Sequence, residues 1–168
     1  KVMYKGVIMA RDEQLGFRDE TLSKRHREYG INCPAADIDL LMIEYNHTIP
    51  CALIEYKFFL SNIDNFDTPT YKAIALLADR QPEIPFFVVF YIPEVWIYKV
   101  IPINNFAKKY IEKCKGKVYF SEDHYIKFLY WLRKEKVDLT KLVIKNIGQE
   151  NNYEETVGKL IASGRSYR

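Results

Sequence analysis

Two apolar runs separated by a short polar break form the most regular pattern in the chain, across residues 37–57, DIDLLMIEYNHTIPCALIEYK. The runs at Leu40–Tyr45 and Ala52–Phe59 have the length and the apolar, β-branched and aromatic composition of core strands. The break between them contains asparagine, histidine and proline, which favour a turn. The pattern therefore predicts an antiparallel hairpin whose turn is centred near residues 47–48.

Charged side chains stand at both ends of this hairpin. Asp37 and Asp39 open the first run, and Glu55 and Lys57 close the second. Charges are costly inside apolar strands unless they are paired or bind a metal. Antiparallel pairing around the turn places Asp39 opposite residues 55–57, and the two-residue alternation puts Glu55 and Lys57 on one face. We therefore expect Asp39, and less so Asp37, to be the partner of Glu55.

Helical and strand-like segments follow one another along the rest of the chain. A helix over 11–29, ended by Gly30, precedes the hairpin, and a helix starting at Thr68 and Pro69 follows it. Strands are then expected over 86–92 and 95–103, followed by a helix that is capped by Asn104 or Asn105 and reaches Cys114, and by a brief strand over 118–120. The last elements are a helix from Ser121 to Lys136, with a core stripe of Tyr125, Phe128, Leu129 and Leu132, and a weak helix over 153–163. This order predicts an α/β domain, with a mixed central β-sheet flanked by helices.

Composition narrows the class of protein. With 168 residues, 48% of them hydrophobic, the chain is expected to form one folded domain over 1–168. No apolar run approaches the ~20 residues of a membrane span, and the first residues lack the pattern of a secretory signal. Three cysteines lie far apart without CxxC spacing, which favours a reducing, cytoplasmic compartment over a disulfide framework or a zinc site.

The net charge of +3 neither requires nor excludes a nucleic-acid partner, but the distribution of charge is informative. Lys24, Arg25, His26 and Arg27 follow one another at the end of the first predicted helix. They either complement the helix C-terminus or contact phosphates, and Arg25 and His26 are the candidates for substrate contact. Lysines over 99–145 form either a solvated helix surface or a nucleic-acid-facing one.

The charged ends of the hairpin fit the requirements of phosphodiester hydrolysis. Mg²⁺ takes oxygen ligands and is held by one or two carboxylates together with substrate phosphates. Asp39 and Glu55 supply two carboxylates, and the backbone carbonyl of Tyr56 is a further candidate ligand. Lys57 can position or activate the attacking water and stabilise the transition state. The alternative is that these charges form only a buried structural ion pair.

The order of a helix, Asp39, the triplet Glu55-Tyr56-Lys57 and a helix from Thr68 resembles the PD-(D/E)XK nuclease superfamily. The proline that the motif places directly before its aspartate is absent, since Pro34 lies five residues earlier. The resemblance covers a core of about residues 11–100 and leaves a helical part, about 101–168, without a counterpart. It implies a restriction-endonuclease-like fold and metal-dependent cleavage of DNA, with Mg²⁺ as the cofactor and Mn²⁺ as a substitute.

The resemblance also suggests roles for residues outside the hairpin. A glutamate of the first helix is often a metal ligand, for which Glu20 and Glu28 are both candidates. A polar residue of the following helix often contacts the substrate, which would be Tyr71 or Lys72. Residues 25–46 and 52–57 are also similar to segments of uncharacterised phage and bacterial proteins, which implies that the protein acts in a bacterial or phage-infected cell. The sequence leaves open whether the protein forms a homodimer.

The sequence is compatible with three functions. The first is a Mg²⁺-dependent DNA nuclease. The second is a catalytically inactive nucleic-acid-binding module on the same scaffold, which would bind in a salt-sensitive way without metal-dependent turnover. The third is a protein-interaction domain that uses the abundant tyrosines as anchors.

Overall fold

The computed structural model describes Arg25, Glu28, Tyr29 and residues 36–44, 47–59, 61, 65–80, 83–93 and 95–142. The chain divides into two compact units, residues 1–36 and 37–168. In the first unit Arg25 is helical and its guanidinium forms an ion pair with Glu28 at 2.5 Å. The rest of the helix expected over 11–29 and the weak helix expected over 153–163 lie outside the described residues. The expectation of a single domain stays a prediction.

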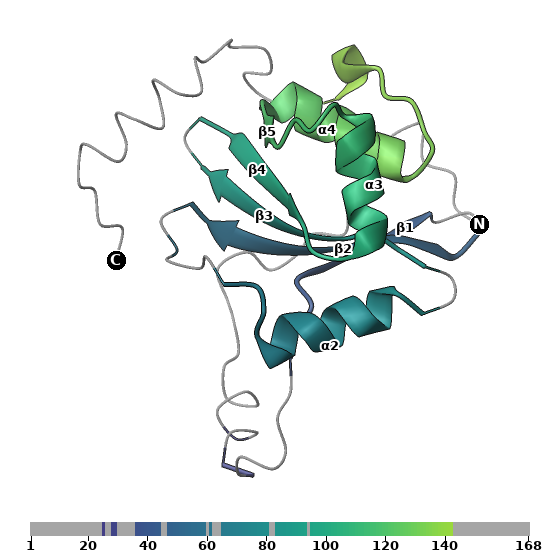
Figure 1. The fold of residues 1–168 in the computed structure, drawn as a ribbon. Helices are drawn as coiled ribbons and strands as arrows, with labels where there is room; N and C mark the ends of the chain where they lie inside the picture. Colours follow the sequence, from purple (N-terminus) through teal and green to yellow (C-terminus); the bar gives the residue numbers. More distant parts are fainter. Residues whose placement is uncertain are drawn as a thin grey trace, which may run out of the picture. The chain divides into compact units, whose positions relative to one another are not determined.

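The second unit is built on a five-stranded sheet with the order β1-β2-β3-β4-β5 (Figure 1). The strands are β1 Leu40–Glu44, β2 Ile49–Phe58, β3 Phe86–Ile92, β4 Ile97–Pro102 and β5 Tyr119–Phe120. β2 and β3 are parallel because helix α2, Pro69–Ala78, connects them, and the other neighbours are antiparallel. The sheet is therefore mixed, and the predicted α/β class is confirmed.

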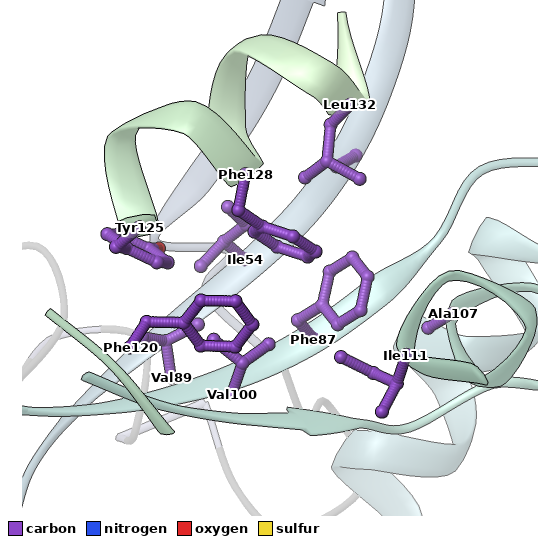
Figure 2. Close-up of a cluster of buried hydrophobic side chains, with 11 residues drawn as sticks. Ile54, Phe87, Val89, Val100, Ala107, Ile111, Phe120, Tyr125, Phe128 and Leu132 are labelled. Carbon is purple, nitrogen blue, oxygen red and sulfur yellow. The ribbon is translucent and has the colours of Figure 1, made fainter. Parts of the chain in front are cut away.

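Helices cover both faces of the sheet, α2 on one and α3, Asn105–Lys113, with α4, Glu122–Leu132, on the other (Figure 1). Alternate residues of β2 belong to different cores: Leu53 packs with α2, whereas Ile54 packs with α3 and α4. Figure 2 shows the second core, where Phe87 of β3 meets Phe128 of α4 with ring centroids 5.4 Å apart. β3 is almost entirely apolar because both of its faces are buried.

Buried Asn104 connects three of these elements. Its Oδ1 accepts hydrogen bonds from the backbone N–H of Ala107 at 2.9 Å and of Phe86 at 3.1 Å, so it caps α3 and holds the start of β3. Its Nδ2 donates to Asp79 Oδ1, after α2, and to the carbonyl of Ile84. The cap expected at Asn104 or Asn105 is therefore Asn104, and every polar atom of its side chain has a partner.

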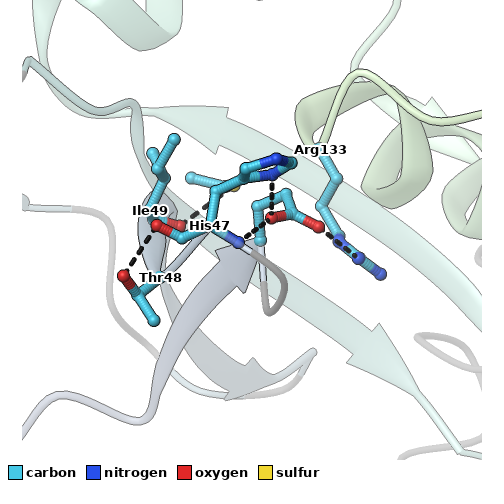
Figure 3. Close-up of polar contacts among 6 residues, drawn as sticks. His47, Thr48, Ile49 and Arg133 are labelled. Carbon is cyan, nitrogen blue, oxygen red and sulfur yellow. Dashed lines mark hydrogen bonds and ion pairs between the residues drawn. The ribbon is translucent and has the colours of Figure 1, made fainter.

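The hairpin differs from its prediction in the start of β2 and in a bulge. β2 begins at Ile49, three residues before the expected start, and a bulge interrupts the pairing with β1 between Met42 and Ile43. Glu44 at the end of β1 accepts hydrogen bonds from the backbone N–H and the ring Nδ1 of His47, and it also pairs with Arg133 at 3.7 Å (Figure 3). The turn is thereby attached to the end of α4.

α4 ends earlier than predicted, at Leu132, with Arg133 as its C-cap. Lys134 adopts a left-handed backbone conformation, φ 60°, which stops the helix before its expected basic last turn. The basic residues Arg133, Lys134 and Lys136 therefore lie beyond the last turn of α4. A short 3₁₀ helix, η1, follows at Leu139–Lys141. The predicted core stripe is confirmed, since Tyr125, Phe128 and Leu132 are buried and Leu129 is half-buried against the same core.

None of the helices in the described residues is both long enough and apolar enough to cross a membrane.

Candidate active site

The carboxyl-terminal half of β2 carries Glu55, Tyr56 and Lys57 in succession. Leu53 packs in the α2 core and Tyr56 packs against the α3–α4 core. Strand alternation therefore directs Glu55 and Lys57 to the α2 face of the sheet, and the prediction that the two residues share one face is confirmed. Both side chains are half-buried, with 14% of Glu55 and 24% of Lys57 exposed.

Glu55 and Lys57 form an ion pair on this face. Lys57 Nζ lies 2.5 Å from Glu55 Oε1. Burial lowers the pKa of Lys57, but the hydrogen bond to Glu55 and the negative charges of Glu55 and Asp39 outweigh it, so the pKa rises above its usual 10.5. Lys57 is therefore an ammonium ion at neutral pH.

Asp39, the residue directly before β1, approaches the same stretch of β2. Its Oδ2 accepts a hydrogen bond of 2.9 Å from the backbone N–H of Tyr56, next to the last β1–β2 pair, Leu40 with Ile54. The predicted position of Asp39 opposite residues 55–57 is confirmed. Its direct contact is the backbone of Tyr56 and not the Glu55 side chain. Asp37 and Asp39 are both exposed, so the cost of buried charge applies to Glu55 and Lys57 only.

The two candidates on α2 have different surroundings. Tyr71 is buried in the α2 core. Burial raises its pKa, the positive charge of Lys57 lowers it, and the charges of Glu55 and Asp39 raise it, so the phenol lies within electrostatic range of all three groups. Lys72 points outward, where its Nζ pairs with Asp67 at 2.9 Å. The structure thus groups Tyr71, and not Lys72, with Asp39, Glu55 and Lys57.

The donor set suits a hard cation better than zinc. Within the described residues, no hydrogen bond occupies the second carboxylate oxygens, Asp39 Oδ1 and Glu55 Oε2. The N–H of Tyr56 points toward Asp39, and in a strand the carbonyl of the same residue points to the same side. The described part of the chain has no group of three His, Cys, Asp or Glu residues placed to hold a metal. Two carboxylates and a carbonyl fit Mg²⁺, which keeps several waters.

The remaining candidates lie in the first unit. Glu20 and His26 fall outside the described residues. Arg25 and Glu28 are exposed and paired with each other. The proposed roles of these four residues in metal or substrate binding stay predictions.

Tyr125 of α4 supports the site from the opposite face of the sheet. Its hydroxyl lies 2.9 Å from that of Tyr56, and its ring stacks on Tyr98 with centroids 4.1 Å apart. The helical periodicity predicted Tyr125 as core, which is confirmed, but gave no signal for the hydroxyl contact. Tyr56 is therefore held by its backbone to Asp39 and by its side chain to α4.

Comparison with protein-family models, with curated proteins and with solved structures found no significant match to this chain. Any indication of function therefore comes from the chain's own residues.

Proposed function

We propose that this protein is a metal-dependent phosphodiester hydrolase of the PD-(D/E)XK type, with a restriction-endonuclease-like fold, that cleaves DNA. One observation carries the proposal. Asp39, the residue directly before β1, accepts a hydrogen bond from the backbone N–H of Tyr56, which lies between the paired Glu55 and Lys57 on β2. This combination of groups suits a centre that binds a cation and a phosphate together.

Asp39 and Glu55 would hold the cation, Mg²⁺ or Mn²⁺, with the Tyr56 carbonyl as a further ligand. The cation would supply a water of lowered pKa and would neutralise charge on the scissile phosphate. The hydrogen bond from Tyr56 N–H orients the Asp39 carboxylate, which leaves the Oδ1 oxygen for the metal.

Lys57 acts in this scheme as a cation and not as a general base. Its raised pKa keeps it protonated at neutral pH, so it donates hydrogen bonds and accepts no proton. An ammonium ion beside the scissile phosphate stabilises the charge that develops on the phosphoryl oxygens. Tyr71, whose raised pKa keeps the phenol neutral, is a second hydrogen-bond donor on the same face.

A second candidate is the inactive nucleic-acid-binding module. The observation that favours it is the Lys57–Glu55 pair at 2.5 Å, in which each charge already has a partner. In such a module the pair would be structural, and binding would need no divalent cation.

A cleavage panel separates these two candidates. Linear, circular, branched and single-stranded DNA would be incubated with Mg²⁺, Mn²⁺ or EDTA, using the wild type and the variants Glu55→Gln and Lys57→Met. The nuclease predicts cleavage that EDTA abolishes and that both variants lose while their circular dichroism spectra remain native. Lys127→Met, which changes an exposed lysine of α4, is the control and should cleave like the wild type. If the wild type binds DNA but cleaves none of these substrates with Mg²⁺ or Mn²⁺, the inactive module is established instead.

A further inference from the structure

Four residues on neighbouring strands form a continuous row that starts at Lys57. The sheet pairs Lys57 with Phe90, Phe90 with Lys99, and Lys99 with Tyr119. Directly paired residues on adjacent strands point to the same face of a sheet. Phe90 packs in the α2 core, so all four side chains belong to the α2 face, the face of Glu55.

Along this row the side chains become more exposed from the centre of the sheet to its edge. Phe90 is buried and packs against Phe66, with ring centroids 6.3 Å apart, so an apolar position separates Lys57 from Lys99. Beyond it, half-buried Lys99 places its Nζ 5.7 Å from the ring centroid of Tyr119. Tyr119 lies on the edge strand with 38% of its surface exposed. A fixed cation followed by an accessible aromatic ring therefore extends outward from Lys57.

The spacing of this row matches a short stretch of nucleic acid. Neighbouring strands lie ~4.8 Å apart, so the backbone at Lys99 is about 10 Å and that at Tyr119 about 14 Å from Lys57. A distance of about 10 Å is within the reach of a few nucleotides of a flexible single strand, so one strand can contact Lys57 and Lys99 together. A phosphate and the base beyond it then fall within reach of the cation and the ring.

We propose that Lys99 and Tyr119 form a subsite for single-stranded nucleic acid, which deepens the proposed function and rests on it. Lys99 contacts a backbone phosphate, and an unpaired base stacks on Tyr119. Proteins that bind single strands combine positive charge along the backbone with aromatic side chains under the bases. A duplex keeps its bases stacked on one another, so the ring selects a single-stranded segment or a frayed end.

The competing explanation is that Lys99 only covers the Tyr119 ring on a solvated edge, as a cation–π pair without a ligand. α3 offers a matched example on the other face, where Lys113 Nζ lies 5.6 Å from the Tyr110 ring centroid. Lys113→Gln is therefore the control for Lys99→Gln, because both substitutions remove one positive charge and one cation–π contact.

The test measures binding of fluorescein-labelled oligothymidine by fluorescence anisotropy over a range of salt concentrations, with EDTA present so that no cleavage occurs. We expect Lys99→Gln to raise the Kd about tenfold and to lower the slope of log K against log salt by about 0.7, as for one lost phosphate contact on a single strand. Tyr119→Ala should weaken binding about tenfold and Tyr119→Phe little, because the stacking ring remains. Equal effects of Lys99→Gln and Lys113→Gln, or unchanged binding by Tyr119→Ala, would overturn the subsite.

The cleavage panel distinguishes a failure of the subsite from a failure of the proposed function. A wild type that cleaves DNA while Lys99→Gln and Tyr119→Ala bind normally retains its function and loses the subsite. A wild type that binds oligothymidine through Lys99 and Tyr119 but cleaves nothing retains the subsite and loses the nuclease. A folded wild type that neither binds nor cleaves overturns both.

Discussion

The backbone N–H of Tyr56 donates a hydrogen bond of 2.9 Å to Asp39 Oδ2, although the two residues are 17 positions apart in the sequence. The bond lies beside the last pair of β1 with β2, so it continues the ladder with a side chain in place of a carbonyl. A carboxylate that accepts a backbone N–H is fixed more firmly than one held by solvent. The position of Asp39 is therefore set by the strand that carries Glu55 and Lys57.

Asp39→Asn tests whether this carboxylate does more than accept the bond. The amide keeps an oxygen for Tyr56 N–H but loses the charge that a cation needs. We expect DNA cleavage to fall at least about 100-fold while the free energy of unfolding changes by less than ~1 kcal/mol. Urea denaturation and cleavage are measured on the same preparations, with Asp37→Asn as the control. Equal losses of cleavage in the two variants would contradict the assignment to Asp39.

Glu55→Gln should lower the pKa of Lys57. Burial alone lowers this pKa, and the hydrogen bond and charge of Glu55 are the largest contributions that raise it. Because the pKa is raised on folding, the protonated lysine stabilises the folded state fully below its ordinary value, near pH 10.5, and this stabilisation is lost as pH rises through the folded value. NMR titration of the lysine ¹³Cε signals measures the change. Asp39→Asn should produce a smaller decrease, and an increase in the pKa for Glu55→Gln would contradict the account.

Asn104→Ala should be strongly destabilising. It removes the cap of α3 and leaves the buried N–H of Phe86 without its Oδ1 acceptor. Loss of a cap costs ~1 kcal/mol, and each buried group left without a partner adds ~1–3 kcal/mol, so we expect about 2–4 kcal/mol in urea denaturation. Asn105→Ala, at the exposed neighbouring position, should cost less than ~1 kcal/mol. Similar losses for the two variants would show that the Asn104 contacts contribute little.

Tyr125→Phe should reduce stability by ~1 kcal/mol, because it leaves the half-buried Tyr56 hydroxyl without the partner it has at 2.9 Å. The double variant Tyr56→Phe, Tyr125→Phe should recover much of this loss, since neither hydroxyl then remains to be satisfied. Thermal unfolding of the two single variants and the double variant gives the coupling between them. Strictly additive losses would show that the two hydroxyls do not interact.

The parts of the fold that the sequence predicted are those specified by local pattern. β3 is apolar on both faces, and Thr68 and Pro69 mark the start of α2, so a few adjacent residues are enough to predict each element. The end of α4 could not be predicted, because residues 133–136 keep a helical composition while Lys134 leaves the helix. The four hydrogen bonds of Asn104 join segments that only the folded chain brings together.

The candidate site was predictable where it depends on strand alternation and not where it depends on packing between layers. Alternation placed Glu55 and Lys57 on one face, and pairing placed Asp39 opposite them. The sequence could not choose between Tyr71 and Lys72, because the rotation of α2 on the sheet decides which one faces the charges. The row from Lys57 to Tyr119 depends on the pairing of β2 with β3, β3 with β4, and β4 with β5, which adjacent residues do not reveal.

The bulge in the hairpin divides it into two segments that differ in their tolerance of insertions and deletions. Between the bulge and Glu55, adding or removing one residue would turn Glu55 and Lys57 into the α3–α4 core and Tyr56 toward α2, because side chains alternate with a period of two. On the turn side of the bulge the same change leaves that alternation intact. Natural variants of this protein should therefore vary in length around His47 and Thr48, while the stretch from Ala52 to Lys57 keeps a constant length.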